Sequence, residues 1–82
     1  MKYVYLLQSQ TTESETYVGA TCDLPRRLEE HNARKCRHTS KYAPWTCVLA
    51  LRFLDDSKAD AFERYLKSGS GRAFAKRHFW QG

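Results

Sequence analysis

The sequence predicts a small α/β protein of the α+β type, with a three-stranded antiparallel sheet flanked by helices. Two short segments rich in β-branched and aromatic residues are joined by a polar hairpin, which makes them antiparallel strands. A later apolar run supplies a third strand, and helix-start signals follow the second and third strands. The expected order is strand, strand, helix, strand, helix, helix, in a single domain over residues 1–82.

The first two strands are expected at "KYVYLLQS" (2–9) and "TYVGA" (16–20), on either side of the polar run "QTTESE". Alternation places the odd-numbered residues of the first strand on one face and the even-numbered residues on the other. Tyr17 and Gly19 share a face of the second strand. Antiparallel pairing can therefore bring Tyr5 and Tyr17 into one neighbourhood.

A helix from about residue 24 to 33 follows the second strand. Asp23 is a good N-cap and Pro25 is tolerated in a first turn. Arg27 and His31 are four residues apart, so they project side by side from one flank of this helix.

The segment "ARKCRHTSKYAPW" (33–45) is basic and lacks periodicity, which predicts a loop. The apolar run "TCVLALRFL" (46–54) predicts a well-buried third strand. A second helix is expected over 58–67, because Ser57 followed by Asp60 resembles a capping box.

Glu63 lies next to the apolar stripe of this second helix rather than on its solvated side. The run "SGSG" (68–71) is expected to end the helix, and "RAFAKRHFW" (72–80) to form a short final helix anchored by Phe74 and Phe79. The stripe of the second helix consists of Ala59, Phe62 and Leu66.

The formal net charge is +5, and its distribution is one-sided: no acid lies between Glu30 and Asp55, and none follows Glu63. Such segments attract polyanions, although a solvated basic surface is the simpler alternative. No apolar run approaches the roughly 20 residues of a membrane span, and we see no targeting segment. The residues expected to contact nucleic acid are Arg26, Arg34, Lys35, Arg37, Lys41, Arg72, Lys76 and Arg77.

Three cysteines cannot all pair with one another, so free thiols in a reducing cytoplasm are expected. His31, Cys36 and His38 lie within eight residues, but their spacing matches no recognised zinc pattern. We interpret them as loop residues or phosphate contacts rather than as a metal site.

Each candidate polar residue also has a structural explanation. Strand tyrosines usually pack in or around the core, and a helix arginine is usually solvated. His31 can be an ordinary helix-end residue, and Glu63 can pair with Lys67 at a spacing of four residues. These five residues, taken together in their order along the chain, are a more specific indication of function than any one of them alone.

That ordered set resembles the GIY-YIG nuclease superfamily. "YVY" (3–5) and "YVG" (17–19) are similar to the paired tripeptides of the family name. "DLPRRLEEHN" (23–32) is similar to the family's arginine-bearing helix, and "ADAFERYLK" (59–67) to its acidic helix. The resemblance extends from residue 2 to about residue 79, and is greatest to short stand-alone members that consist of the nuclease domain.

The resemblance implies a metal-dependent endonuclease that hydrolyses DNA phosphodiester bonds. Glu63 would hold one Mg²⁺ or Mn²⁺ ion, and Arg27 would stabilise charge on the phosphate. Tyr5, in preference to Tyr17, would orient or deprotonate the attacking water, with His31 assisting.

Gly19 would permit a close approach of the backbone, and Asn32 matches the "HN" of stand-alone members. The first tripeptide begins with Tyr3 rather than glycine, and Ala20 stands where some members carry lysine. The expected partner is DNA, with branched or damaged DNA included, and a monomer is favoured. Two alternatives stay open: a nucleic-acid-binding module of the same fold without activity, and a small α/β protein whose basic face binds RNA or a protein.

Overall fold

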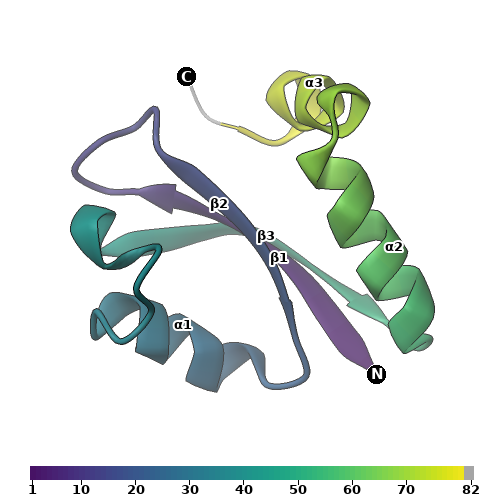
Figure 1. Ribbon diagram of the computed structural model, residues 1–82, viewed down its shortest axis with the longest axis horizontal. Helices are drawn as coiled ribbons and strands as arrows, with labels where there is room; N and C mark the ends of the chain where they lie inside the picture. Colours follow the sequence, from purple (N-terminus) through teal and green to yellow (C-terminus); the bar gives the residue numbers. More distant parts are fainter. Residues whose placement is uncertain (81–82) are drawn as a thin grey trace.

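The computed structural model describes residues 1–80 and confirms the α+β architecture and the order of its elements (Figure 1). Within these residues no helix has the length and apolar character that a membrane span requires. The elements are β1 (Lys2–Ser9), β2 (Thr16–Thr21), α1 (Leu24–Asn32), a 3-10 helix (Ser40–Tyr42), β3 (Trp45–Phe53), α2 (Asp56–Lys67) and α3 (Gly69–His78).

The sheet has the order β2-β1-β3, and β1 pairs antiparallel with both neighbours. In the β1–β2 pair, Tyr5 lies opposite Gly19 and Leu7 lies opposite Tyr17. Tyr5 and Tyr17 are therefore diagonal neighbours, as the alternation of the two strands predicts. The β1–β3 register shifts between Leu6 and Leu7, which marks an irregularity in the centre of the sheet.

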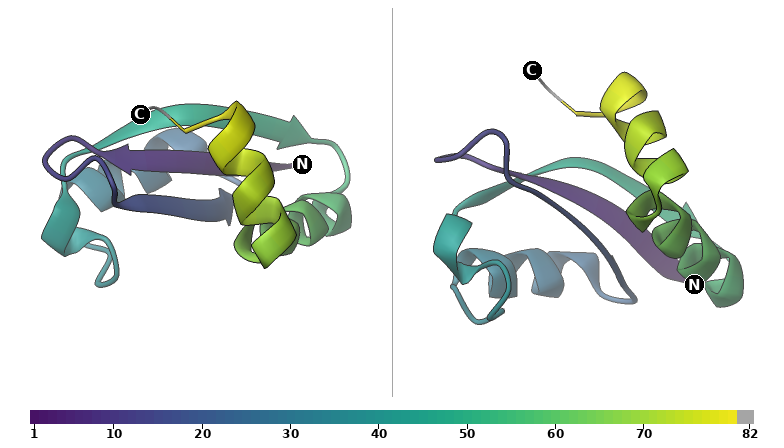
Figure 2. Two further views of the ribbon diagram at one scale, coloured as in Figure 1. Left: turned by 90° about the horizontal axis from the view of Figure 1, so that it is seen from above. Right: turned by 45° about the horizontal axis from the view of Figure 1, so that its top comes forward.

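The helices cover opposite faces of the sheet, with α1 on one side and the α2–α3 pair on the other (Figure 2). Val4 and Leu6 face α2 and α3, where they pack with Leu66. Tyr5 and Leu7 face the α1 side. Because successive strand residues point to opposite faces, β1 contributes to both clusters and is the most buried strand.

Helix α2 begins earlier than expected, at Asp56, because Asp55 rather than Ser57 is its N-cap. The Asp55 carboxylate accepts hydrogen bonds from Ser57 N at 2.9 Å and from Ser57 Oγ at 2.7 Å. The expected capping box of Ser57 with Asp60 is therefore wrong. A carboxylate satisfies the unpaired N–H groups of the first turn directly.

The break between α2 and α3 is shorter than the expected "SGSG" segment. Ser68 alone interrupts the helices, and its hydroxyl accepts a hydrogen bond from Gly71 N at 3.2 Å, so α3 begins at Gly69 rather than at Arg72. A methyl group at Gly71 would overlap the carbonyl of Tyr65. Glycine at this position thus allows α3 to turn tightly against the end of α2.

Two other expectations are corrected. The third strand is not well buried, because β3 is an edge strand in which only Trp45, at its start, is buried and the other residues are partly buried or exposed. Phe74 does not anchor α3, since its side chain is 38% exposed, whereas Ala75 is buried and Phe79 packs against the core. The expected loop of residues 33–45 contains the 3-10 helix Ser40–Tyr42.

Candidate active site

Helix α1 carries the residues of the candidate site and is fixed at its start as expected. The Asp23 carboxylate accepts a hydrogen bond from Arg26 N at 3.2 Å. Leu28 packs against the buried cluster that contains Tyr5. This packing places the flank of Arg27 and His31 against β1. His31 of α1 therefore contacts Tyr5 of β1 on the face of the sheet that α1 covers.

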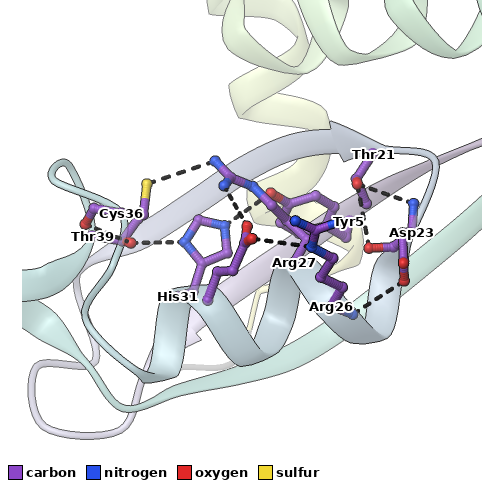
Figure 3. Close-up of polar contacts among 9 residues, drawn as sticks. Tyr5, Thr21, Asp23, Arg26, Arg27, His31, Cys36 and Thr39 are labelled. Carbon is purple, nitrogen blue, oxygen red and sulfur yellow. Dashed lines mark hydrogen bonds and ion pairs between the residues drawn. The ribbon is translucent and has the colours of Figure 1, made fainter.

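A line of buried hydrogen bonds begins at Tyr5 (Figure 3). Tyr5 Oη lies 2.9 Å from His31 Nε2, and His31 Nδ1 lies 2.7 Å from Thr39 Oγ1. Thr39 Oγ1 donates to the Cys36 carbonyl at 3.4 Å, so Thr39 accepts from His31 Nδ1–H. His31 Nε2 then accepts from the Tyr5 hydroxyl. Trp45 Nε1 donates a hydrogen bond to the Thr39 carbonyl at 2.9 Å, which fixes Thr39, the last residue of the line.

The buried line is electrically neutral. Burial raises the pKa of Tyr5 to about 12, although the neighbouring Arg27 guanidinium opposes this rise. Burial, followed by the positive charge of Arg27, lowers the pKa of His31 below its ordinary value. Tyr5 and His31 are 1% and 0% exposed, so at neutral pH both keep the neutral forms that the hydrogen-bond directions require.

Arg27 extends from this line towards solvent. Its Nη1 donates to the Glu30 carboxylate at 3.0 Å, and its Nη2 lies 3.7 Å from Cys36 Sγ. Hydrogen bonding to Tyr5 and then to Glu30 raises the pKa of the Arg27 guanidinium. The side chain is 34% exposed, which leaves a charged, oriented guanidinium within reach of a ligand.

Tyr17 packs beside both buried rings, with its ring centroid 6.2 Å from that of Tyr5 and 5.0 Å from that of His31. Gly19 makes this packing possible. A Cβ atom at Gly19 would lie 2.5 Å from Tyr5 Oη and 2.9 Å from Tyr17 Cε2. The close approach expected at this glycine is therefore made by the two tyrosine side chains rather than by another backbone segment.

Glu63 lies on α2, on the other side of the sheet from α1, and its connection to the site runs through Lys67. Its carboxylate accepts a hydrogen bond from Lys67 Nζ at 3.2 Å, which confirms the pairing at four residues' spacing. The same Lys67 Nζ lies 6.0 Å from the centroid of the Tyr17 ring. Lys67 thus links the carboxylate to the edge strand that carries Tyr17.

The five candidate residues fall into a buried and an accessible group. Tyr5 and His31 are closed off from solvent, whereas Tyr17 is partly buried and the side chains of Arg27 and Glu63 are 34% and 23% exposed. The accessible group combines a phenol, a guanidinium and a carboxylate. This set can bind a phosphate, contact a water molecule and ligate a hard cation.

The metal implied by the resemblance has one clear protein ligand. Within residues 1–80, no group of three or more histidine, cysteine or acidic side chains is placed to hold a metal ion. Glu63 is the carboxylate of the accessible group, whereas the Glu30 carboxylate already accepts a hydrogen bond from the Arg27 guanidinium at 3.0 Å. A single carboxylate completed by water and substrate oxygens suits Mg²⁺, which keeps several waters in protein sites.

The eight basic residues expected to contact nucleic acid are all exposed, but they lie in two groups. One group belongs to α1 and the following loop, where the Arg34 guanidinium donates to the carbonyls of Ser40 at 3.1 Å and Ala43 at 3.5 Å. The other group belongs to α3. In that group Arg72 and Lys76 line a groove of about 960 Å³ that Tyr17 also borders.

The sequence did not single out Thr39, the partner of His31, and it named Cys36 only as a loop residue or phosphate contact, not as a neighbour of Arg27. They lie in an aperiodic loop, and the pattern of residues there gives no indication of their partners. Asn32 has a structural role: its Oδ1 accepts from Trp45 N at 2.6 Å and its Nδ2 donates to Trp45 O at 3.3 Å. The "HN" pair therefore joins the buried line to the first residue of β3.

Comparisons with known proteins show what the chain is similar to. The model of the family described as "GIY-YIG catalytic domain" matches residues 1–77. A structure-specific endonuclease subunit SLX1 from Scheffersomyces stipitis is 41% identical over 54 residues, which cover 58% of this chain and 16% of that protein. The subunit of the same name from Cryptococcus neoformans var. neoformans serotype D is 38% identical over 52 residues, 57% of this chain and 11% of that protein. The matched region is thus a small part of each relative.

Replacement of Gly19 by alanine tests the packing of the two tyrosines. Tyr5 is fully packed and cannot move aside, so we expect the free energy of unfolding of Gly19→Ala to fall by about 1–3 kcal/mol. Urea denaturation measures this change. Gly69→Ala is the matched control, because a methyl group there meets nothing within 4 Å. Equal stability of the two variants would contradict the packing described.

The lowered pKa of His31 predicts a pH dependence of stability. Because the neutral ring is favoured in the folded state, its contribution is fully present above about pH 6.5 and is lost as the pH falls through the folded-state pKa. We expect urea denaturation to show this loss as the pH falls below about 6.5. The loss should persist in His38→Gln, an exposed loop variant, and diminish in His31→Gln. An equal pH response of both variants would argue against a buried neutral His31.

Proposed function

The chain belongs to the GIY-YIG catalytic domain family, and on that premise we propose that it is a metal-dependent endonuclease hydrolysing DNA phosphodiester bonds. One observation carries the proposal: a buried, neutral Tyr5–His31 pair supports an accessible phenol, guanidinium and carboxylate on neighbouring elements. Within a family of catalytic domains, this combination suits the charge changes of phosphodiester hydrolysis.

Arg27 is the phosphate-binding group of the proposed mechanism. Its planar guanidinium can donate two hydrogen bonds to phosphate oxygens, and these strengthen as negative charge builds in the transition state. Glu30 and Cys36 orient it from the helix and the loop. The contact with Tyr5 supports the positive charge, because the raised pKa of Arg27 excludes its deprotonation.

Tyr17 is the tyrosine that meets the attacking water. We therefore propose the reverse of the preference that the sequence suggested, because Tyr5 is 1% exposed and its hydroxyl is already committed to His31. Tyr17 lies at the edge of the sheet, beside Lys67. The phenol of Tyr17 orients the water. Tyr5 and His31 hold the Tyr17 ring in place by packing against it, and Tyr5 also contacts Arg27.

Glu63 is the proposed ligand of Mg²⁺ or Mn²⁺. Such an ion, when bound, polarises the phosphate and stabilises charge on the leaving oxygen. Lys67 pairs with the Glu63 carboxylate at 3.2 Å on the side of α2 that approaches β2. The remaining accessible groups position the substrate around this carboxylate.

The proposed substrate is DNA that departs from a regular duplex, including branched or damaged DNA. The relatives named as structure-specific endonuclease subunits support this proposal, although the chain spans only 11–16% of their lengths. The exposed basic residues on both sides of β2 would hold the phosphate backbone. Three free cysteines fit the proposed reducing, cytoplasmic setting.

Replacement of Glu63 by glutamine tests the metal-dependent activity. We expect the initial rate of nicking of supercoiled plasmid with Mg²⁺ or Mn²⁺ to fall about a hundredfold or more, because the amide lacks the charge that holds the cation. Gel electrophoresis of the nicked and supercoiled forms measures the rate. Glu29→Gln, on the exposed side of α1, is the matched control and should nick as the parent does.

A chelator should stop nicking by the parent and by Glu29→Gln. If Glu63→Gln nicks as fast as the parent in protein purified in the same way, the proposed role of Glu63 is wrong. If neither protein nicks any DNA, whether supercoiled, branched or damaged, the chain is a binding module without this activity.

A further inference from the structure

A groove with a volume of about 960 Å³ lies between the β1–β2 hairpin, β2 and α3. Residues 79–80 follow the end of α3 (Figure 1), and Trp80 lines the groove. Val18, Leu66 and Ala75 contribute apolar wall. Trp80 also packs against the core, so its indole is held in place rather than free in solvent.

The charged residues of the groove are mostly basic. Lys67, Arg72 and Lys76 line it from α2 and α3, opposed by Glu13 from the hairpin. Lys67 is also the residue that pairs with Glu63. An apolar wall with an aromatic ring, bordered by an excess of cations, is complementary to a ligand with flat apolar parts and a phosphate backbone.

We propose that this groove binds an unpaired strand of DNA, with one base stacked on Trp80 and its phosphates held by Arg72 and Lys76. Bases within a duplex present only their edges in the grooves of the helix, whereas an unpaired base presents a full face to an aromatic side chain. The proposal rests on the proposed nuclease function and defines its substrate further: the DNA has a single-stranded portion next to the bond that is cut.

The position of the groove supports this assignment. Tyr17 borders the groove and also packs on His31, so one side chain belongs to both the groove and the candidate active site. Lys67 likewise lines the groove and approaches the Tyr17 ring. A strand lying along α3 would therefore lead to the Tyr17 phenol and to Lys67, the partner of Glu63.

Binding can be measured without cleavage, in the presence of a chelator, by the fluorescence anisotropy of a labelled oligothymidylate. We expect the single strand to bind more tightly than a labelled duplex of equal length. Lys76→Ala should weaken single-strand binding severalfold, and Trp80→Ala about tenfold, the loss typical of one stacked base. Lys58→Ala, at the opposite end of α2 from Lys67, removes the same charge and should bind as the parent does.

Tryptophan fluorescence gives a second, direct measurement. Stacking of a base on Trp80 should quench the emission of the protein, and Trp80→Phe should lose this quenching while it keeps an apolar ring against the core. Trp45 is 5% exposed and its indole N–H is bound to the Thr39 carbonyl, so it should not respond. Trp80→Phe keeps the test valid if Trp80→Ala does not fold.

Several results would overturn the proposal: duplex binding as tight as single-strand binding, quenching that persists in Trp80→Phe, or equal weakening by Lys58→Ala and Lys76→Ala. Tighter binding of an oligouridylate than of oligothymidylate would show that the occupant of the groove is RNA rather than DNA. The nuclease function is tested separately by nicking. Single-strand binding at the groove without nicking would refute the function alone, and nicking without such binding would refute the groove assignment alone.

Discussion

The hydrogen bond between the Tyr5 hydroxyl and His31 Nε2 joins the central strand to α1, and the candidate site is arranged around it. Both side chains are almost fully buried, so each polar atom needs a protein partner, and leaving one unpaired would cost about 1–3 kcal/mol. Thr39 satisfies the second nitrogen of His31. Gly19 leaves the space that the Tyr5 hydroxyl occupies. The neighbouring β2 strand must therefore have no side chain at this point.

The electrostatics of the site follow from the same burial. A neutral phenol and a neutral imidazole form the interior, and the charged groups lie at the surface around them. Arg27 keeps its charge because Tyr5 and Glu30 both stabilise it. Glu63 forms an ion pair with Lys67 at the surface. A charged group at the surface can pair either with a protein partner or with a ligand. A charge on Tyr5 or His31 would instead be buried, which costs free energy.

Much of the fold could be predicted from sequence because its signals are local. Alternation in β1, the Asp23 cap and the four-residue spacing of Arg27 and His31 each depend on near neighbours along the chain. The predictions that failed concern competing local signals and long-range packing. Asp55 displaced Ser57 as a cap, and the apolar third strand proved to be an edge strand of the sheet.

The candidate site shows the same division. The motif gave the family, which the family match confirmed, and it named residues that the structure brings together around His31. It could not show which tyrosine is accessible, since that depends on how α1 covers β1. Nor could it indicate Thr39, because Thr39 meets His31 and Trp45 only once the loop of residues 33–45 has folded.

The most direct test of this account compares the nicking rates of Tyr17→Phe and Tyr5→Phe, after circular dichroism has shown that both fold. If Tyr17 contacts the attacking water, Tyr17→Phe should lose about 10²–10⁴-fold in rate. Tyr5→Phe should lose stability but keep measurable nicking with an unchanged pH profile, because it removes a support and not a reacting group. An inactive Tyr5→Phe together with a fully active Tyr17→Phe would contradict the account.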